Sequence, residues 1–302
     1  MSKAPIDFWK LSAAGNDFIC IDARGGSLDT VLREPRKPPG LARKLCARGH
    51  GIGADGVFFA TRPDIEGVAD IAALHYEADG SECELCGNGT GCFTYWVSMT
   101  DVVPNRRFEQ IRILTPAGVV LGQNLDEAYV RVCIPTPEGE LTDLRLEAAG
   151  REFACDFVIT GIPHVITYVE DVEQADVDRW GYALRHHEEF QPRGANANFV
   201  QVLGEGEIAL RTWEFGVEGE TLACGTGSAA SAIMTALREG WGGDIVTGEQ
   251  PVLVHTRGGY TLRMAFTLDD DGHIDDCCLD TPVRLTYTGR LHPDYVHELT
   301  DC

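Results

Sequence analysis

Two cysteines, one in each half of the chain, stand directly before a glycine-rich helix start. They open the motifs Cys86-Gly-Asn-Gly and Cys224-Gly-Thr-Gly, and helix-length segments follow at residues 90–100 and 228–239. The start of a helix leaves backbone N–H groups without acceptors and has partial positive charge. This charge favours a thiolate and lowers the pKa of a cysteine there. Glycines let an anion approach the N–H groups closely, so each motif can hold a carboxylate beside a reactive thiol.

Two such motifs can invert a stereocentre without a cofactor. If both helix starts hold one substrate carboxylate, the α-carbon lies between two sulfurs. One sulfur, as thiolate, removes the α-proton, and the other, as thiol, returns a proton to the opposite face. Dipoles of the N–H groups around the carboxylate stabilise the carbanion. The plain alternative is that Cys86 and Cys224 are buried cysteines in tight glycine turns.

Short strands account for most of the remaining chain. Hairpins are expected at 6–23, 111–121 and 252–266, a short helix at 41–48, and single strands at 57–60, 71–76, 128–134, 153–160, 165–169, 199–202, 208–213 and 283–288. Residues 25–40 are rich in proline and glycine, which predicts an exposed insertion. The strand pattern starts again after Gly122. The sequence therefore predicts two β-rich halves, each around one central helix.

The composition excludes several classes of protein. The chain of 302 residues has a net charge of −22, which would repel a nucleic-acid backbone. No apolar stretch is long enough for a membrane helix, and the N-terminus has no secretory signal. The 11 cysteines are scattered, and no second CxxC pair follows Cys83-Glu-Leu-Cys86. We therefore expect mostly reduced thiols, no metal site and a cytoplasmic location.

Several motifs in chain order resemble those of the diaminopimelate epimerase family. They are Gly15-Asn16-Asp17-Phe18, Gly51-Ile52-Gly53-Ala54-Asp55-Gly56, Ala78-Asp79-Gly80-Ser81-Glu82 leading to Cys86, Pro163-His164, Asn196-Ala197-Asn198-Phe199-Val200, Glu214 and Gly219-Glu220-Thr221-Leu222-Ala223-Cys224. The proline racemase family has the same pair of cysteines, but its flanking motifs match less well.

The resemblance implies an α/β (α+β) protein with two pseudo-symmetric domains. Each domain would be a β-barrel-like sheet around a central helix, the diaminopimelate epimerase-like fold. The N-terminal domain would comprise residues 1–122 plus 283–302, because the last strand returns to it, and would carry Cys86. The C-terminal domain, residues 123–282, would carry Cys224.

The resemblance also assigns roles to individual residues. Cys86 and Cys224 are implied to be the catalytic acid and base. The remaining assigned residues would bind the substrate: Gly87, Asn88, Gly225 and Thr226 through N–H groups to the α-carboxylate, Asn16 and Asn196 through their side chains, and His164 and Glu214 as polar neighbours that set thiol protonation and hold the α-amino group.

Three residues depart from the family pattern at the positions that hold the far end of diaminopimelate. Glu77 and Ile162 stand where the family usually has asparagine, and Phe215 stands where it has arginine. Arginine is the natural bidentate partner of a carboxylate. Phe215 removes this charge, and Glu77 would repel a distal carboxylate while attracting a cation. We therefore expect Glu77 and Phe215 to contact a different side chain.

The function hypothesis is an isomerase, an amino-acid racemase or epimerase that needs neither pyridoxal phosphate nor a metal. The departures favour a basic or aromatic amino acid such as histidine as the substrate. The alternative is a diaminopimelate epimerase, converting the L,L form to the meso form, with a rewired distal site. A non-catalytic relative would lack one of the two cysteines. A small amino acid is the expected partner, with no nucleic acid or membrane, and a homodimer remains open.

Overall fold

The computed structural model describes residues 5–25, 28, 32, 34, 37–100, 102–126, 128–134, 136–269 and 271–300, with only the backbone described for 297, 298 and 300. The chain divides into two compact units. Unit 1 comprises Met1–Val132 and Pro282–Cys302, and unit 2 comprises Cys133–Thr281. The boundary expected after residue 122 falls inside a strand of unit 1, Gly118–Asn124.

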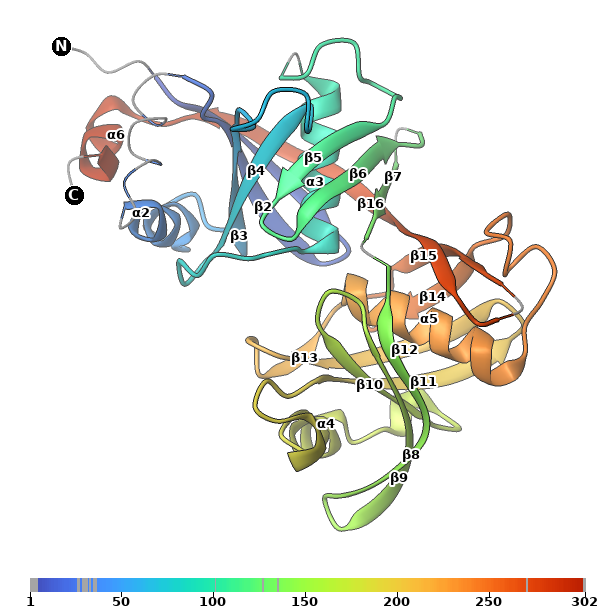
Figure 1. Ribbon diagram of the computed structural model, residues 1–302. Coiled ribbons are helices and arrows are strands. Elements are labelled where there is room, and N and C mark those ends of the chain that lie inside the picture. Colours follow the sequence, from blue (N-terminus) through green and yellow to red (C-terminus); the bar gives the residue numbers. More distant parts are fainter. Residues whose placement is uncertain are drawn as a thin grey trace. The chain divides into compact units, whose positions relative to one another are not determined.

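The strands of unit 1 form a closed ring. Its elements are β1 (Asp7–Ala13), β2 (Asn16–Asp22), α2 (Lys37–Cys46), β3 (Gly56–Thr61), β4 (Ile71–Glu77), α3 (Gly87–Met99), β5 (Ile111–Thr115), β6 (Gly118–Asn124), β7 (Tyr129–Cys133), the second part of β16 (Ile274–Arg290) and α6 (Pro293–Thr300). The strand order runs from β1 to β7 and then to β16, which also pairs with β1. Figure 1 shows these elements.

The central helix of unit 1 is α3, which packs on β1, β2 and β6. Its sequence is apolar on all sides, as expected for a helix enclosed by protein. Phe93 and Trp96 are fully buried and lie with ring centroids 5.6 Å apart, and Trp9 of β1 lies 5.4 Å from Trp96. This core fixes the helix whose first residue follows Cys86.

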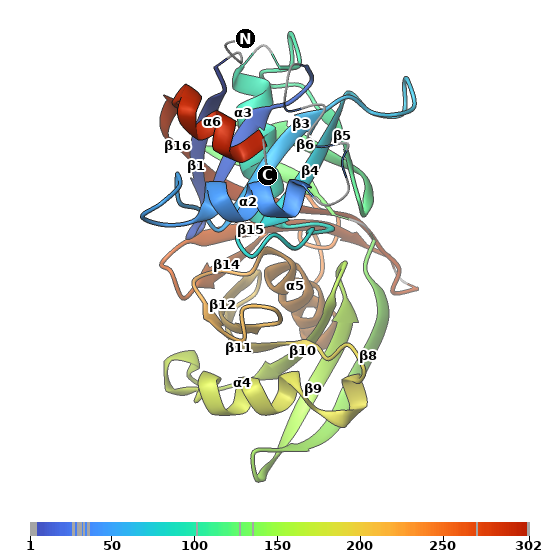
Figure 2. The ribbon, with the colours of Figure 1, turned by 90° about the vertical axis from the view of Figure 1, so that its left-hand side faces the viewer.

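A second core of unit 1 lies between the sheet and two further helices. Leu41 and Leu45 of α2 and Val296 of α6 are buried in it. Figure 2 shows α2 and α6 near one another, and the Tyr295 hydroxyl donates to the Lys44 carbonyl at 2.9 Å. The prediction of an exposed insertion at 25–40 is wrong at its end. Residues 37–40 form the first turn of α2, where a proline costs no hydrogen bond.

Unit 2 repeats this arrangement with an open sheet. Its elements are β8 (Glu138–Ala148), β9 (Arg151–Ile159), β10 (Pro163–Tyr168), α4 (Val177–Arg185), β11 (Asn196–Gly204), β12 (Glu207–Glu214), β13 (Gly219–Thr221), α5 (Gly225–Glu239), β14 (Val252–Thr256), β15 (Thr261–Leu268) and the first part of β16, with short 3₁₀ turns at Val172–Gln174 and Glu188–Phe190. The strand order is β16-β15-β14-β12-β11-β10-β9-β8, with β13 on β12.

The alanine-rich helix α5 occupies the centre of unit 2. It packs on β9, β10, β11, β12, β14 and β15 (Figure 2), and its residues from 226 to 236 are buried. Small side chains let strands approach the helix from several sides. The helix α4 packs on the outer part of the same sheet against β11 and β12, with Leu184 buried in that cluster.

The two units share one topology. In unit 1 the parallel pairs β2–β3 and β4–β5 are connected through α2 and α3, and in unit 2 the parallel pairs β10–β11 and β12–β14 are connected through α4 and α5. Parallel neighbours need such crossovers. The repeat inferred from the two cysteine motifs is thus a repeat of whole elements, and the predicted mixed α/β fold with a central helix in each half is confirmed.

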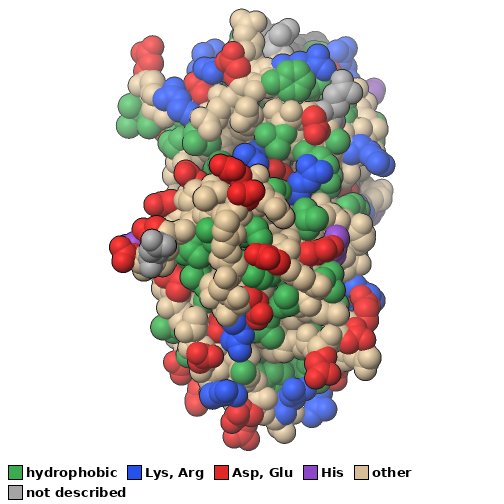
Figure 3. All heavy atoms as spheres, turned by 90° about the vertical axis from the view of Figure 1, so that its right-hand side faces the viewer, with side chains coloured by type: hydrophobic (Ala, Val, Ile, Leu, Met, Phe, Trp, Pro, Cys, Tyr) green, Lys and Arg blue, Asp and Glu red, His purple; other side chains and the backbone are tan. Residues whose placement is uncertain are grey.

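Most described cysteines are free thiols, as expected. The one disulfide among the described residues joins Cys133 and Cys278 on β7 and β16. None of the described helices is long and apolar enough to span a membrane. Figure 3 shows acidic side chains spread over one face with Lys and Arg side chains between them.

Candidate active site

Cys86 caps the first turn of α3. Its backbone is extended, and its Sγ accepts a hydrogen bond from the N–H of Gly89 at 3.4 Å. A serine, threonine or aspartate usually fills this position, so a cysteine here places sulfur where a capping oxygen would lie. The ring of Phe58 explains the glycine, because a Cβ on Gly89 would lie 2.7 Å from it.

Asn88 and Asn16 are held together beside this cap. The buried Asn88 donates its side-chain amide to Asn16 Oδ1 at 3.0 Å, and Asn16 donates to Asp55 Oδ2 at 3.3 Å. Asp17 also bonds the Asp55 backbone N–H at 3.0 Å. These contacts join three of the motifs that are far apart in the sequence.

A charged network supports that cluster from outside. The Arg48 guanidinium lies 2.7 Å from Asp17 and 2.8 Å from Asp55, and Lys10 Nζ lies 2.7 Å from Asp17. Partial burial opposes the charge of Asp17, but the hydrogen bonds of Arg48 and Lys10 outweigh it and lower the pKa of Asp17. The Asp17 carboxylate therefore stays ionised and fixes the start of β2, where Asn16 lies.

Cys224 caps α5 in the same way as Cys86 caps α3. Its backbone is extended, and its Sγ accepts from the Gly227 N–H at 3.3 Å. A Cβ on Gly227 would lie 2.6 Å from Asn198 Oδ1. The glycine three residues after each cysteine is therefore required by close packing as well as by the cap.

A chain of hydrogen bonds leads from Asn198 to Cys224. The Thr212 hydroxyl donates to Asn198 Oδ1 at 3.0 Å, which turns the Asn198 Nδ2 towards His164 Nδ1, 3.0 Å away. His164 Nε2 then donates to the Thr226 hydroxyl at 3.1 Å, and that hydroxyl lies 3.5 Å from Cys224 Sγ. The tautomer of the imidazole follows from this network. Thr226 can thus direct its own proton to the sulfur.

His164 is a neutral member of this chain. Burial lowers its pKa to about 3, against the smaller opposing effect of the Asn198 hydrogen bond. The imidazole is therefore uncharged near neutral pH. It fixes the Thr226 hydroxyl without adding a positive charge that would favour the Cys224 thiolate.

Cys224 differs from the sequence expectation. The helix start was expected to lower its pKa, whereas the structure raises it well above the usual value. Burial is the largest cause, followed by the negative charge of Glu214; the Thr226 hydroxyl and the Gly227 N–H act in the opposite direction and do not outweigh them. Burial also raises the pKa of Glu214, whose Oε1 accepts from the Thr221 hydroxyl at 2.6 Å. Cys224 is therefore a thiol in the resting protein.

Asn196 and Phe215 meet at the end of β12. The buried Asn196 accepts the backbone N–H of Phe215 through Oδ1 at 2.6 Å, so its carbonyl oxygen positions the chain after Glu214. The Phe215 ring is half-exposed, and the Arg185 guanidinium lies 4.3 Å from its centroid. Arg185 also lies 3.2 Å from Glu218. The positive charge of Arg185 therefore lies beside Phe215, the residue that stands where the family pattern has an arginine.

Glu77 lies at the end of β4 beside two other polar groups. Its Oε1 is 3.6 Å from His75 Nε2. Burial raises the pKa of the Cys83 thiol, and the negative charge of Glu77 raises it further. The ligand atoms of these three side chains lie within 4.8 Å of one another. The sequence predicted no metal site, and the spacing of these three residues does not indicate this cluster, which the fold brings together. An exposed group in unit 2 meets the same criterion, namely Asp269, Asp271 and His273.

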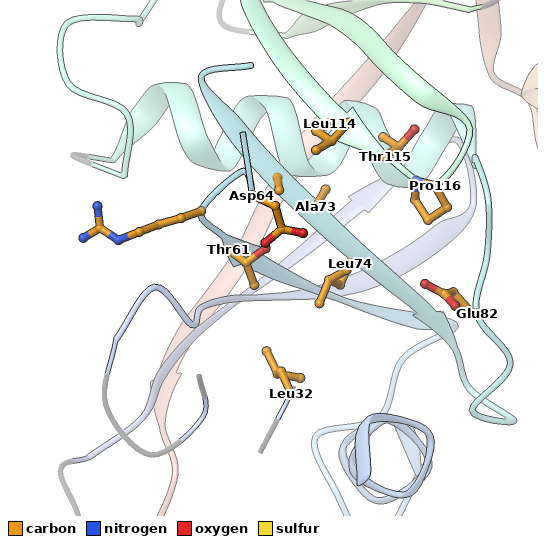
Figure 4. A pocket seen from close by; sticks show the side chains of 11 residues that line it. Leu32, Thr61, Asp64, Ala73, Leu74, Glu82, Leu114, Thr115 and Pro116 are labelled. Atoms are coloured by element: carbon orange, nitrogen blue, oxygen red, sulfur yellow. The ribbon is translucent and has the colours of Figure 1, made fainter. Parts of the chain in front are cut away.

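A hollow of about 400 Å³ lies elsewhere in unit 1. Figure 4 shows side chains of β4 and β5 around it, and its lining is Leu32, Thr61, Arg62, Asp64, Ala72, Ala73, Leu74, Glu82, Leu114, Thr115 and Pro116. None of the residues expected to bind the substrate is in this lining. The hollow therefore has no part in the candidate site.

The predicted residues fall into two groups within the units. Unit 1 brings together Cys86, Asn88 and Asn16, and unit 2 brings together Cys224, Thr226, His164, Asn196, Glu214 and Phe215. The sequence reasoning assigned no role to Asn198, Thr221 or Arg185. Asn198 was part of a quoted motif, and its period-2 spacing from Asn196 on a strand could have placed both on one face.

Comparison with known proteins agrees with this geometry. The family model described as diaminopimelate epimerase matches residues 8–133 and 157–275. The chain is 37% identical to the diaminopimelate epimerase of Aquifex aeolicus over 287 residues, which are 95% of this chain and 98% of that protein. It is 33% identical to that of Chlorobaculum tepidum over 281 residues, 93% of this chain and 99% of that protein.

Solved structures with low sequence identity share the fold. A phenazine biosynthesis protein of the PhzF family from Bacillus anthracis superposes with a TM-score of 0.71 at 16% identity, covering 96% of this chain and 99% of that one. A hydroxyproline epimerase from Agrobacterium vitis superposes with a TM-score of 0.69 at 14% identity, covering 95% and 92%.

Proposed function

The chain belongs to the diaminopimelate epimerase family and is an amino-acid epimerase that works without pyridoxal phosphate, and we propose that its substrate is diaminopimelate. The observation that supports this substrate most is the similarity, over nearly the whole chain, to relatives that carry this name. The two cysteines that cap α3 and α5 would transfer the α-proton. The distal end of the substrate would be held by residues specific to this chain.

In the proposed mechanism, the α-carboxylate is bound by backbone N–H groups in the first turns of α3 and α5. These groups belong to Gly87, Asn88, Gly225 and Thr226. A thiolate takes the α-proton, and the electron pair of the broken C–H bond spreads onto the carboxylate held by these groups. The thiol of the other cysteine gives its proton to the opposite face of the α-carbon. The two sulfurs have then exchanged protonation states, which suits the reverse reaction.

The environment of Cys224 suits it to begin a turnover as the proton donor. Its raised pKa keeps the proton on the sulfur, so Cys86 would be the base that takes the first proton. For the other stereoisomer, Cys224 must become the thiolate. Glu214 can accept its proton, and the Thr226 hydroxyl and the Gly227 N–H can stabilise the resulting charge.

Arg185 is our candidate for the distal carboxylate. Its guanidinium lies over Phe215 and is paired with Glu218, which is half-exposed. A substrate carboxylate could take the place of the Glu218 side chain in this pair. Arginine binds a carboxylate through two hydrogen bonds, and such contacts contribute about 1.5–3 kcal/mol. This would restore the charge that Phe215 removes.

The substrate is tested by comparing kcat/KM for L,L-diaminopimelate, L-histidine, L-lysine and L-arginine under reducing conditions. Exchange of the α-proton for deuterium in D₂O is the assay. The proposal expects diaminopimelate to be best by at least tenfold, about 1.4 kcal/mol. Arg185→Met is expected to lower kcat/KM for diaminopimelate but not for lysine. The matched control Arg145→Met removes an exposed arginine of unit 2 that pairs with Glu152, and it is expected to change neither value.

A second candidate function is racemisation of a basic or aromatic amino acid such as histidine. Glu77 favours it, because its carboxylate would attract a cationic or N–H-donating side chain, and Phe215 offers a half-exposed ring. If a monocarboxylic basic amino acid were best by tenfold, this second function would replace the first. In that case Glu77→Asn with Phe215→Arg is expected to return the preference towards diaminopimelate.

The cytoplasmic location and the homodimer stay as proposals. The free thiols among the described cysteines are typical of a protein in a reducing compartment. The Cys133–Cys278 disulfide is not typical of one. Cell fractionation tests the location, and analytical ultracentrifugation of the purified protein tests the assembly.

A further inference from the structure

His75 is a buried histidine whose ring nitrogens have no hydrogen-bond partner among the residues that the structure describes. Its side chain is 3% exposed, and both Nδ1 and Nε2 lack a partner. The ring is stacked on Phe58 with centroids 4.1 Å apart. A buried N–H or nitrogen without a partner costs about 1–3 kcal/mol. An orphaned polar group of this kind calls for a missing ion, water or partner.

The backbone brings two further ligand atoms to the same ring. After β4 the chain turns at residues 77–81, where the Glu77 N–H bonds the Ser81 carbonyl at 2.9 Å. The returning chain places the Cys83 N–H 3.0 Å from the His75 carbonyl. These main-chain hydrogen bonds fix the backbone positions from which the side chains of His75, Glu77 and Cys83 approach one another.

The distances fit a shared ion better than a hydrogen bond. His75 Nε2 and Glu77 Oε1 are 3.6 Å apart, too long for a hydrogen bond. Two ligands of one tetrahedral zinc ion, each about 2.0–2.2 Å from the metal, are about 3.4 Å apart. All three ligand atoms lie within 4.8 Å of one another, close enough to share one ion.

We propose that His75, Glu77 and Cys83 form a binding site for Zn²⁺. Imidazole, thiolate and carboxylate are the ligands that zinc takes, while magnesium and calcium take oxygen ligands alone. Three protein ligands leave the fourth position for water, and the half-exposed Glu77 gives solvent access to it. On binding, the Cys83 thiol forms a bond to zinc and releases its proton to the buffer.

The site would act on the segment that leads to the cap of α3. Cys83 lies three residues before Cys86, and the turn at 77–81 separates it from β4. A bound zinc ion would join both sides of this turn. It would also balance the negative charge of Glu77. This inference is independent of the proposed substrate, because its readouts do not depend on activity.

The test is titration of the purified, reduced and metal-free protein with Co²⁺, followed by competition with Zn²⁺. Cobalt in place of zinc gives sulfur-to-metal charge-transfer absorption and intense visible bands when it is four-coordinate with a thiolate. The expected result is saturation at one equivalent, with full displacement by one equivalent of Zn²⁺. Absence of these bands at saturating cobalt would overturn the proposal.

Variants assign the bands to these residues. Cys83→Ala is expected to abolish the charge-transfer band, and His75→Leu to weaken cobalt binding more than about tenfold. The matched control Cys155→Ala removes a buried free thiol of unit 2. A second control, His273→Ala, removes one ligand from the exposed cluster of Asp269, Asp271 and His273. Both controls are expected to keep the bands. Circular dichroism verifies that each variant is folded. Bands that persist in a folded Cys83→Ala protein would contradict the proposal.

Discussion

Replacing Thr226 with valine tests the hydrogen-bond chain that reaches Cys224. Valine keeps the shape of threonine and removes the hydroxyl, which lies 3.1 Å from His164 Nε2 and 3.5 Å from Cys224 Sγ. Two effects are expected. The buried His164 N–H loses its acceptor, and the Cys224 thiolate loses a donor. The first lowers stability, and the second lowers the rate.

The magnitudes follow from the same two bonds. A buried donor without an acceptor costs about 1–3 kcal/mol of the free energy of unfolding. A hydrogen bond to a charged group contributes about 1.5–3 kcal/mol, which corresponds to about a 10- to 150-fold loss in kcat/KM. The hydroxyl lowers the pKa of Cys224. Its removal therefore raises that pKa, and the rise of activity with pH is expected to shift to higher pH.

The assay is α-proton exchange in D₂O as a function of pH, with urea unfolding of the same samples. Thr235→Val is the matched control, because Thr235 is a buried threonine of α5 whose hydroxyl bonds the Ser231 carbonyl at 2.6 Å. The control is expected to keep the pH profile of the unchanged protein. A Thr226→Val enzyme with kcat/KM within twofold of the unchanged enzyme and the same pH profile would refute the role of the hydroxyl.

Three further predictions concern charge and packing. Glu214→Gln removes the charge that helps to raise the pKa of Cys224, so in a Cys86→Ala background iodoacetamide is expected to alkylate Cys224 faster at neutral pH; equal or slower alkylation would count against this. Gly89→Ala places a Cβ 2.7 Å from the Phe58 ring and is expected to cost about 1–3 kcal/mol in urea unfolding, whereas Gly40→Ala in α2, with open space around it, is expected to stabilise by up to about 1 kcal/mol. Burial lowers the pKa of His164 from 6.5 to about 3, so the unfolded chain binds more protons in this window and stability is lost as the pH falls through it; His164→Gln is expected to flatten this loss, and an unchanged slope would contradict the assignment.

The two caps could be predicted from the sequence because they depend on local residues. A cysteine at the cap, two glycines in the first turn and an apolar helix after them are all contiguous in the chain, and the structure places the caps at Cys86 and Cys224 as expected. The repeated motif also predicted the two β-rich halves. The units repeat their strands and crossovers in the same order, so one local signal gave the global arrangement.

The first turn of α2 and the whole of α4 were not predicted, because each contains residues that usually interrupt helices. Pro38 and Pro39 fall in the first turn of α2, where their missing N–H groups are not needed. Gly181 lies inside α4. A larger residue would not fit there, because a Cβ would lie 2.6 Å from the Cβ of Trp213. The two prolines fit because of their position in the helix and the glycine because of its packing, and the sequence pattern alone shows neither.

The protonation of Cys224 and the cluster around His75 could not be read from local patterns. The cap alone predicts a lowered pKa, but burial and Glu214, ten residues earlier, reverse the direction. His75, Glu77 and Cys83 have no spacing typical of a metal site, and a turn in the main chain brings them together. Effects of desolvation and of chain reversal depend on the packed structure.

The central claim is that Cys86 and Cys224 each carry a proton for opposite faces of the α-carbon. It is tested by following the optical rotation and α-deuterium content of diaminopimelate and of the basic amino acids in D₂O with the Cys86→Ala and Cys224→Ala enzymes. General acid–base groups contribute about 10²- to 10⁴-fold each, and the account predicts that each variant loses stereoinversion by at least that factor while Cys155→Ala does not. Inversion near the rate of the unchanged enzyme in either single variant would contradict the two-cysteine mechanism.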